Sequence, residues 1–119
     1  MTEEVKVGFI GLGNMGGGMS ANILKAGFPL IVHDLNRDAA TQLLENGADW
    51  ADTPAELATS CDVVFTSLPG PREVEAIALG EGGILEGMRP GTVYIDLSTS
   101  SPSLIRRLAP IFQEKGVHI

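Results

Sequence analysis

The chain has 119 residues, of which 44% are hydrophobic, and it carries a formal net charge of −7. This length suffices for one domain and not two, and the composition is that of a globular chain rather than a disordered one. An acidic surface repels phosphate backbones, which argues against nucleic acid as a partner. The first four residues include two glutamates and do not begin a signal peptide, and no apolar stretch of the sequence is long enough to span a membrane. We therefore expect a cytoplasmic protein.

Short apolar runs alternate with helical patterns along the chain, which predicts parallel strands joined by helices. We expect strands at residues 5–10, 30–32, 48–50, 63–68 and 92–96, and the start of a sixth strand at 117–119. We expect helices at about residues 14–26, 37–46 and 71–79, one that begins after residue 53, one that begins at 102, and one turn at 85–88. These elements predict a Rossmann-type doubly wound parallel sheet that is truncated in its sixth strand.

Several residues mark where the predicted helices begin and end. Gly27 and Gly47 follow the first two helices, where a glycine commonly ends a helix. Thr53 before a proline, and Ser101 before another, are typical of helix caps. Pro110 lies within the last predicted helix, where a missing backbone donor should kink or shorten it. Cys61, the single cysteine, is interpreted as a small core residue, with a reactive thiol as the alternative.

The residues directly after the first predicted strand fit the pattern G-x-G-x-x-G. An apolar strand precedes the pattern, a helix opens within it, and Asp34 ends the next strand 18 residues after Gly16. The alternative interpretation is a structural turn in some other α/β protein. In its context the pattern predicts a pyrophosphate site at a helix N-terminus. The predicted cofactor contacts of this loop are Gly11, Leu12, Gly13, Asn14, Met15 and Gly16.

Each glycine of the loop has a physical role in such a site. Gly11 permits the tight turn, Gly13 lets the pyrophosphate approach the backbone, and Gly16 lets the helix pack closely on the strand. Gly17 and Gly18 extend the run to three consecutive glycines, each of which costs up to ~1 kcal/mol relative to alanine in a helix interior. A purely structural helix start has little reason to carry that cost, which favours a binding function.

The end of the second strand predicts which dinucleotide binds. Asp34 is expected to accept hydrogen bonds from the adenosine ribose hydroxyls and to repel a 2′-phosphate, which favours NAD over NADP. Leu35 and Asn36, further predicted cofactor contacts, occupy the turn where NADP sites usually supply an arginine. Arg37 is interpreted as an exposed residue at a helix start, with a turn toward a phosphate as the alternative.

Three segments, in this order, resemble the β-hydroxyacid dehydrogenase family, which includes 3-hydroxyisobutyrate dehydrogenase, 2-hydroxy-3-oxopropionate reductase and 6-phosphogluconate dehydrogenase. The first comprises residues 11–27, with the glycine loop. The second is Leu-Pro-Gly-Pro at residues 68–71 together with Val74, and it resembles the family's loop near the cofactor. The third, residues 96–102, resembles the family's substrate motif D-x-S-T-x-x-P. The resemblance covers nearly the whole chain.

The resemblance implies roles for individual residues. Leu68, Pro69 and Val74 would contact the cofactor, Ser98 would help to hold the substrate carboxylate, and Thr99 would lie near the nicotinamide and the substrate. The carboxyl end of a parallel strand is where ligands bind in such sheets. The alternative is that this stretch only caps the following helix.

The resemblance also implies that part of the enzyme lies outside the sequence. In the family a lysine acts as general acid/base, in a motif beyond this region. None of the three lysines, Lys6, Lys25 and Lys115, has such a setting, and His33 and His118 form no triad or metal cluster. The all-helical domain that closes the site and forms the dimer is missing too. We therefore expect residues 1–119 to be a dinucleotide-binding domain, incomplete at its C-terminus, with little or no turnover by itself.

The leading hypothesis is the cofactor domain of an NAD-linked oxidoreductase that acts on a small β-hydroxy acid and is a homo-oligomer in its full-length form. One alternative is a non-catalytic NAD-binding sensor or partner module, against which the truncated sixth strand argues. Another is a different oxidoreductase with the same half-fold, such as ketopantoate or pyrroline-5-carboxylate reductase, against which the motif at residues 96–102 argues.

Overall fold

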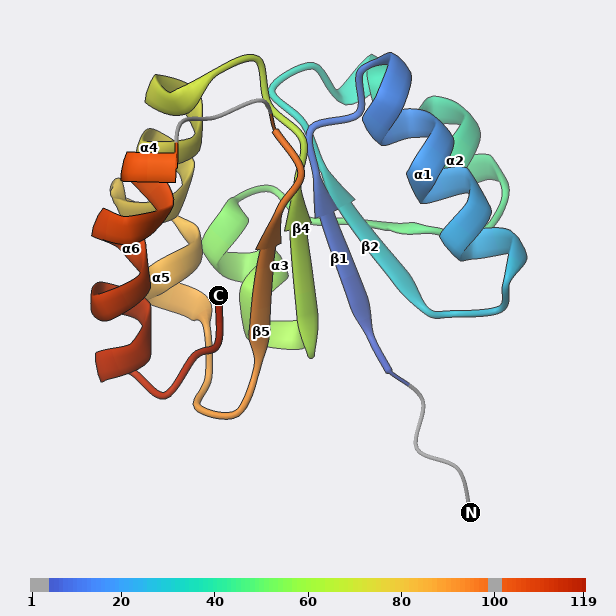
Figure 1. Ribbon diagram of the computed structural model, residues 1–119. Helices are drawn as coiled ribbons and strands as arrows, with labels where there is room; N and C mark the ends of the chain where they lie inside the picture. The colour runs from blue at the N-terminus through green and yellow to red at the C-terminus, as the bar shows by residue number, and fades with distance from the viewer. Residues whose placement is uncertain (1–4, 99–101) are drawn as a thin grey trace.

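The computed structural model describes residues 5–98 and 102–119 of the chain. Within these residues, five parallel strands form one sheet with the order β3-β2-β1-β4-β5 (Figure 1). The strands are β1 (Val7–Ile10), β2 (Leu30–His33), β3 (Asp49–Trp50), β4 (Val63–Thr66) and β5 (Val93–Asp96). The helical elements are α1 (Asn14–Lys25), η1 (Arg37–Ala40), α2 (Thr41–Glu45), α3 (Pro54–Ser60), α4 (Pro71–Leu79), α5 (Ile84–Gly87) and α6 (Pro102–Glu114). This order confirms the predicted Rossmann-type doubly wound sheet.

Helices cover both faces of the sheet, and each layer has its own hydrophobic core. The helices α1 and α2 lie on one face, and α3 to α6 lie on the opposite face (Figure 1). Successive strand residues point to opposite faces, so Phe9 and Val32 pack in the first core while Ile10, Val64 and Tyr94 pack in the second. None of these five side chains is more than 1% exposed. Burial on both faces explains why the strands are continuous apolar runs in the sequence.

The elements differ from the sequence prediction in detail. The strand β1 begins at Val7 rather than at residue 5, and the second predicted helix is divided into the 3₁₀ turn η1 and the short helix α2. Pro110 does not end α6, which continues to Glu114. Leu108 and Phe112 are completely buried on either side of this proline, and their packing outweighs the hydrogen bond that proline cannot donate.

Several local predictions are confirmed. Gly27 and Gly47 follow the ends of α1 and α2 with φ of 94° and 109°, a conformation that favours glycine. The Thr53 hydroxyl accepts a hydrogen bond from the backbone N–H of Glu56 at 3.1 Å, as an N-cap does. The last residues also begin to pair with β5, since His118 forms a parallel bridge with Val93.

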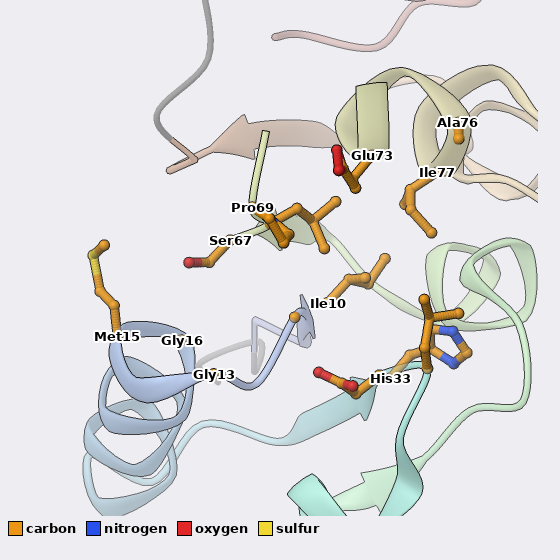
Figure 2. A pocket seen from close by; sticks show the side chains of 14 residues that line it. Ile10, Gly13, Met15, Gly16, His33, Ser67, Pro69, Glu73, Ala76 and Ile77 are labelled. Carbon is orange, nitrogen blue, oxygen red and sulfur yellow. The ribbon is translucent and has the colours of Figure 1, made fainter. Parts of the chain in front are cut away.

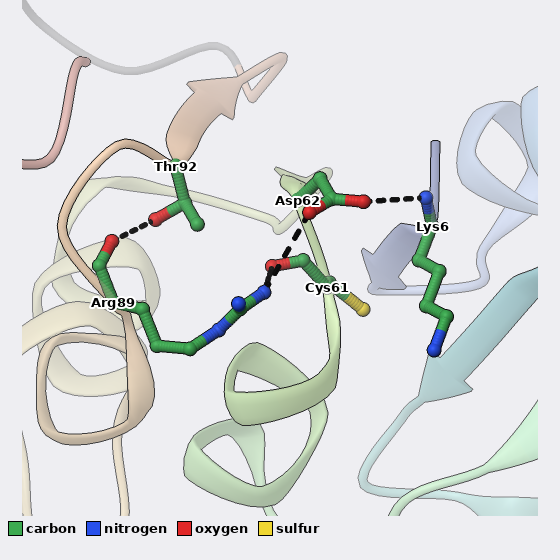
Figure 3. Close-up of polar contacts among 5 residues, drawn as sticks. All are labelled: Lys6, Cys61, Asp62, Arg89 and Thr92. Atoms are coloured by element: carbon green, nitrogen blue, oxygen red, sulfur yellow. Dashed lines mark hydrogen bonds and ion pairs between the residues drawn. The ribbon is translucent and has the colours of Figure 1, made fainter. Parts of the chain in front are cut away.

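Side chains tie strands and loops together at the amino ends of β1, β4 and β5. We call Lys6, Cys61, Asp62, Arg89 and Thr92 the amino-end clamp (Figure 3). The Asp62 carboxylate accepts a hydrogen bond from the Lys6 backbone N–H at 2.9 Å and lies 3.6 Å from the Arg89 guanidinium. Arg89 also donates to the Cys61 carbonyl at 3.0 Å, and its own carbonyl accepts from the Thr92 hydroxyl at 2.6 Å. The clamp joins three segments that are distant in the sequence.

The Cys61 thiol belongs to the core and not to an exposed site. The residue is completely buried in the cluster beneath α3 to α6. Burial, and secondarily the neighbouring charge of Asp62, raises the pKa of this thiol to about 12. A thiol that stays protonated is a poor nucleophile, which agrees with the structural interpretation of this cysteine. In the described part of the chain, no helix is both long enough and apolar enough to cross a membrane.

Candidate functional site

A cleft of about 640 Å³ opens at the carboxyl ends of β1, β2 and β4 (Figure 2). It lies where the strand order reverses, which is where ligands bind in open α/β sheets. Its volume is within the range of roughly 300–1,000 Å³ that is usual for small-molecule sites. The cleft residues that the sequence predicted as cofactor contacts are Gly11, Gly13, Met15, Gly16, Asp34, Leu35, Leu68 and Pro69.

The glycine loop forms one wall of the cleft, and its three glycines meet different surroundings. Gly11 has φ of +96°, and a Cβ atom there would lie 2.1 Å from the Ser67 carbonyl oxygen. A Cβ on Gly16 would lie 2.0 Å from the Gly11 carbonyl oxygen and 3.2 Å from the Phe9 ring. A Cβ on Gly13 would meet nothing within 4 Å. The fold itself therefore requires the first and third glycines, whereas Gly13 leaves space that the fold does not fill.

The same loop leads directly into α1. Gly13 is the N-cap of this twelve-residue helix, it supplies no capping side chain, and no acidic residue lies in the first turn. The first N–H groups of a helix have no partner within it, and they carry the positive end of the helix dipole. The loop thus presents backbone donors and partial positive charge beside the open space at Gly13, an arrangement that suits a phosphate group.

Asp34 connects the glycine loop to the turn after β2. Its carboxylate accepts hydrogen bonds from the backbone N–H groups of Leu12 at 2.7 Å and of Asn36 at 2.9 Å, one on each oxygen. Each carboxylate oxygen can accept a second hydrogen bond, so these contacts leave capacity for ligand hydroxyls. Two separate backbone donors thus hold the carboxylate at the cleft.

A hydrogen-bonded chain orders the segment that contains Ser98. The Thr66 hydroxyl donates to Asp96 at 2.8 Å, and because it has one proton, the buried Tyr94 hydroxyl must donate to Thr66, also at 2.8 Å. Burial raises the pKa of Tyr94 well above its ordinary value, so this donor stays protonated. Asp96 also accepts from the Ser98 N–H at 3.0 Å. The Ser98 hydroxyl in turn accepts from the Leu68 N–H at 2.6 Å, which joins the loops after β4 and β5.

Some predicted contacts do not face the cleft. The Leu12 side chain is 6% exposed and packs in the core, so only its backbone reaches this region. Asn36 caps η1 by accepting from the Asp38 N–H at 3.1 Å. Val74 is completely buried, because the apolar face of α4 packs against the sheet. Its position gives no support to the prediction that it contacts a cofactor. Thr99 lies outside the described residues.

Other residues line the cleft although sequence reasoning missed them, namely Ile10, His33, Ser67, Glu73, Ala76 and Ile77. The last three follow the helical spacing i, i+3 and i+4, so a stripe on α4 was a signal that could have identified them. His33 and Ser67 lie at the ends of β2 and β4, where a side chain could face either core. His33 is 7% exposed, and its Nδ1 donates to the Ala51 carbonyl at 2.9 Å.

Comparisons with known proteins agree with this geometry. The model for the NAD binding domain of 6-phosphogluconate dehydrogenase matches residues 6–119. A probable mitochondrial 3-hydroxyisobutyrate dehydrogenase from Dictyostelium discoideum is 47% identical over 105 residues, which are 88% of this chain and 33% of that protein. The structure of 3-hydroxyisobutyrate dehydrogenase from Mycobacterium tuberculosis with L-serine has a TM-score of 0.86 at 31% identity, over 98% of this chain and 39% of that chain. The structure of Psf3 in complex with NADP+ and 2-OPP has a TM-score of 0.86 at 32% identity, over 94% of this chain and 40% of that chain.

The fold and the glycine loop define a dinucleotide-binding domain of the Rossmann class. The chain belongs to the family of NAD-binding domains of 6-phosphogluconate dehydrogenase, with which the predicted resemblance agrees. Its ligand class is therefore a nicotinamide dinucleotide. The chain spans between 33% and 40% of the length of the three relatives described above.

Proposed function

We propose that this chain is the cofactor domain of an NAD-preferring oxidoreductase that transfers a hydride between the nicotinamide and a small β-hydroxy acid. The observation that carries the proposal is the open space at Gly13, beside the N-terminus of α1 and the held carboxylate of Asp34. Relatives named 3-hydroxyisobutyrate dehydrogenase support the reaction class. The homo-oligomer and the additional helical domain belong to the same proposal. The cytoplasmic location is also only a proposal, because the Dictyostelium relative is named as mitochondrial.

The charges at the cleft support the preference for NAD over NADP. Asp34 and Glu73 both line it, and neither a lysine nor an arginine is among the lining residues that the structure describes. The 2′-phosphate of NADP adds negative charge at the adenosine ribose, which a carboxylate repels and a guanidinium would attract. The cleft thus offers NADP repulsion without a compensating cation.

The residues of this chain bind and orient, and the cofactor, when bound, supplies the hydride acceptor or donor. The N–H groups at the start of α1 would hold the pyrophosphate, and the Asp34 carboxylate would accept from the ribose hydroxyls. The Ser98 hydroxyl, fixed against the Leu68 N–H, would contribute to an anion site for the substrate carboxylate beyond the end of β5. We assign the general acid/base to none of the described residues, since no lysine lies at the cleft among them.

Titration of the chain with NADH and NADPH, followed by the fluorescence of the reduced nicotinamide, tests the proposal. Two matched variants separate binding from folding. Gly13→Ala places a methyl group where the pyrophosphate would lie, and the loss of one charge-assisted hydrogen bond would weaken NADH binding by about tenfold or more. Gly18→Ala is the control, because its Cβ also meets nothing within 4 Å but it does not line the cleft.

We expect NADH to bind more tightly than NADPH, Gly13→Ala to weaken binding, and Gly18→Ala to leave it unchanged. Equal loss in both glycine variants would show that the loop is only structural. Equal affinity for the two dinucleotides would contradict the NAD preference while leaving the binding site in place.

A further inference from the structure

An arginine lies close to Asp34 in the sequence but turns toward a different partner. Arg37 begins η1, three residues after Asp34, and is exposed. Its guanidinium carbon lies 5.4 Å from the centroid of the Trp50 ring. This separation is within the range of about 6 Å for a cation–π interaction. Arg37 does not line the cleft, and its side chain is directed to the β3 edge of the sheet.

Trp50 is held in place by contacts that do not involve Arg37. Its indole N–H donates to the Asp52 carboxylate at 2.9 Å. Its ring also packs against the His33 imidazole, with 5.4 Å between the centroids, and Trp50 pairs with Val32 in the sheet. The aromatic face is therefore already ordered when Arg37 contacts it, so the contact costs the side-chain entropy of the arginine but not that of Trp50.

We propose that Trp50 is a specificity-determining residue, which disfavours NADP by holding the Arg37 guanidinium away from the 2′-position of the adenosine ribose. The inference rests on the proposed function, which places that ribose beside Asp34. A 2′-phosphate there needs a cation, and a guanidinium is the group that pairs best with phosphate. Arg37 would first have to leave the Trp50 ring, so the cation–π contact adds to the repulsion by Asp34.

Removal of the aromatic ring should therefore improve NADPH binding and leave NADH binding unchanged. We expect Trp50→Leu to lower the dissociation constant for NADPH about two- to fivefold, the factor that corresponds to a cation–π contact of ~0.5–1 kcal/mol. Trp50→Phe keeps a π face and is the matched control, with a nearly unchanged ratio of the two dissociation constants. Because Trp50 is the only tryptophan, binding is followed by NADH and NADPH fluorescence or by calorimetry rather than by protein fluorescence.

The double variant Trp50→Leu with Arg37→Gln identifies the group that is released. If Arg37 is that group, the gain in NADPH affinity disappears in the double variant. Circular dichroism checks folding, and should Trp50→Leu unfold, Trp50→Met replaces it, since a flexible thioether chain adapts to the space left by the indole without a π face.

Each remaining outcome bears on the proposal. If NADH binds but Trp50→Leu does not change the ratio of the dissociation constants, Trp50 has no part in specificity and the proposed function stands. If the gain survives in the double variant, Arg37 is not the withheld cation and the inference is overturned. If the unaltered chain binds neither dinucleotide, the proposed function and this inference are overturned together.

Discussion

The two ends of the parallel sheet are built from different kinds of residue. At the amino ends, the polar groups of the amino-end clamp pair with one another, and the side chains of Asp62 and Arg89 connect the neighbouring loops (Figure 3). At the carboxyl ends, glycines bring the backbone to the surface, and α1 begins without a capping side chain (Figure 2). Groups already paired within the chain can only stabilise it, whereas backbone donors at an uncapped helix start can bind a ligand. We therefore expect substitutions at one end to change stability alone and those at the other to change binding.

The largest expected effect is at Gly16, where both the stability of the fold and the binding of the dinucleotide depend on one position. In Gly16→Ala the new methyl group would lie 2.0 Å from the Gly11 carbonyl oxygen, a backbone atom that cannot move without the loop. Overpacking of this kind costs roughly 1–3 kcal/mol or more. We expect a lower free energy of unfolding in urea and loss of measurable NADH binding. A variant of normal stability and affinity would show that the loop relaxes freely.

Ser98→Ala tests the connection between the loops after β4 and β5. It leaves the part-buried Leu68 N–H without the acceptor that lies 2.6 Å away, at a cost of about 1–3 kcal/mol. Because Leu68 and its neighbour Pro69 line the cleft, NADH affinity should fall as well. Ser60→Ala, exposed at the end of α3, is the control and should change neither quantity. Unaltered stability of the Ser98 variant would contradict a positioning role for this hydroxyl.

The buried thiol of Cys61 predicts a pH dependence that does not involve the cleft. Its pKa is raised to about 12 in the folded chain, so the unfolded chain, with a thiol pKa of ~8.5, loses this proton first as pH rises. The stabilisation is complete below a pH of ~8.5 and is lost as the pH rises from there toward the folded pKa of about 12, by about 1.4 kcal/mol per pH unit. Urea denaturation at pH 7.5 and 9.5 measures this change in the free energy of unfolding. In Cys61→Ala the part of the change that the thiol causes should disappear. An identical slope in that variant would assign the effect to other groups.

The smallest effect is expected from Arg89→Met, which opens the amino-end clamp. The ion pair with Asp62 is about half exposed and contributes little, and the hydrogen bond to the Cys61 carbonyl contributes about 1 kcal/mol. We expect a slightly lower melting temperature and an unchanged dissociation constant for NADH. Arg106→Met removes the same charge from the exposed face of α6 and serves as the control. A weaker affinity for NADH in the Arg89 variant would contradict the separation between the two ends of the sheet.

The sequence by itself determined the strands, most helix ends and the glycine loop. These features follow from short-range patterns, namely apolar runs, glycines with positive φ such as Gly27, and the spacing from Gly11 to Asp34. Each depends on neighbours in the chain, so local physical rules suffice to predict it. Pro110 is one exception, since burial of one face of α6 outweighed the local rule.

Only the tertiary structure decided which side chains meet across the fold. The rotation of α4 places Val74 in the core and Glu73 at the cleft; helical spacing separates the two residues onto different faces, but the packing of α4 decides what each face meets. The contact of Arg37 with Trp50, like the hydrogen bond between Leu68 and Ser98, joins segments brought together by strand pairing. Such contacts depend on the order and register of the strands in the sheet, which no short window of sequence contains.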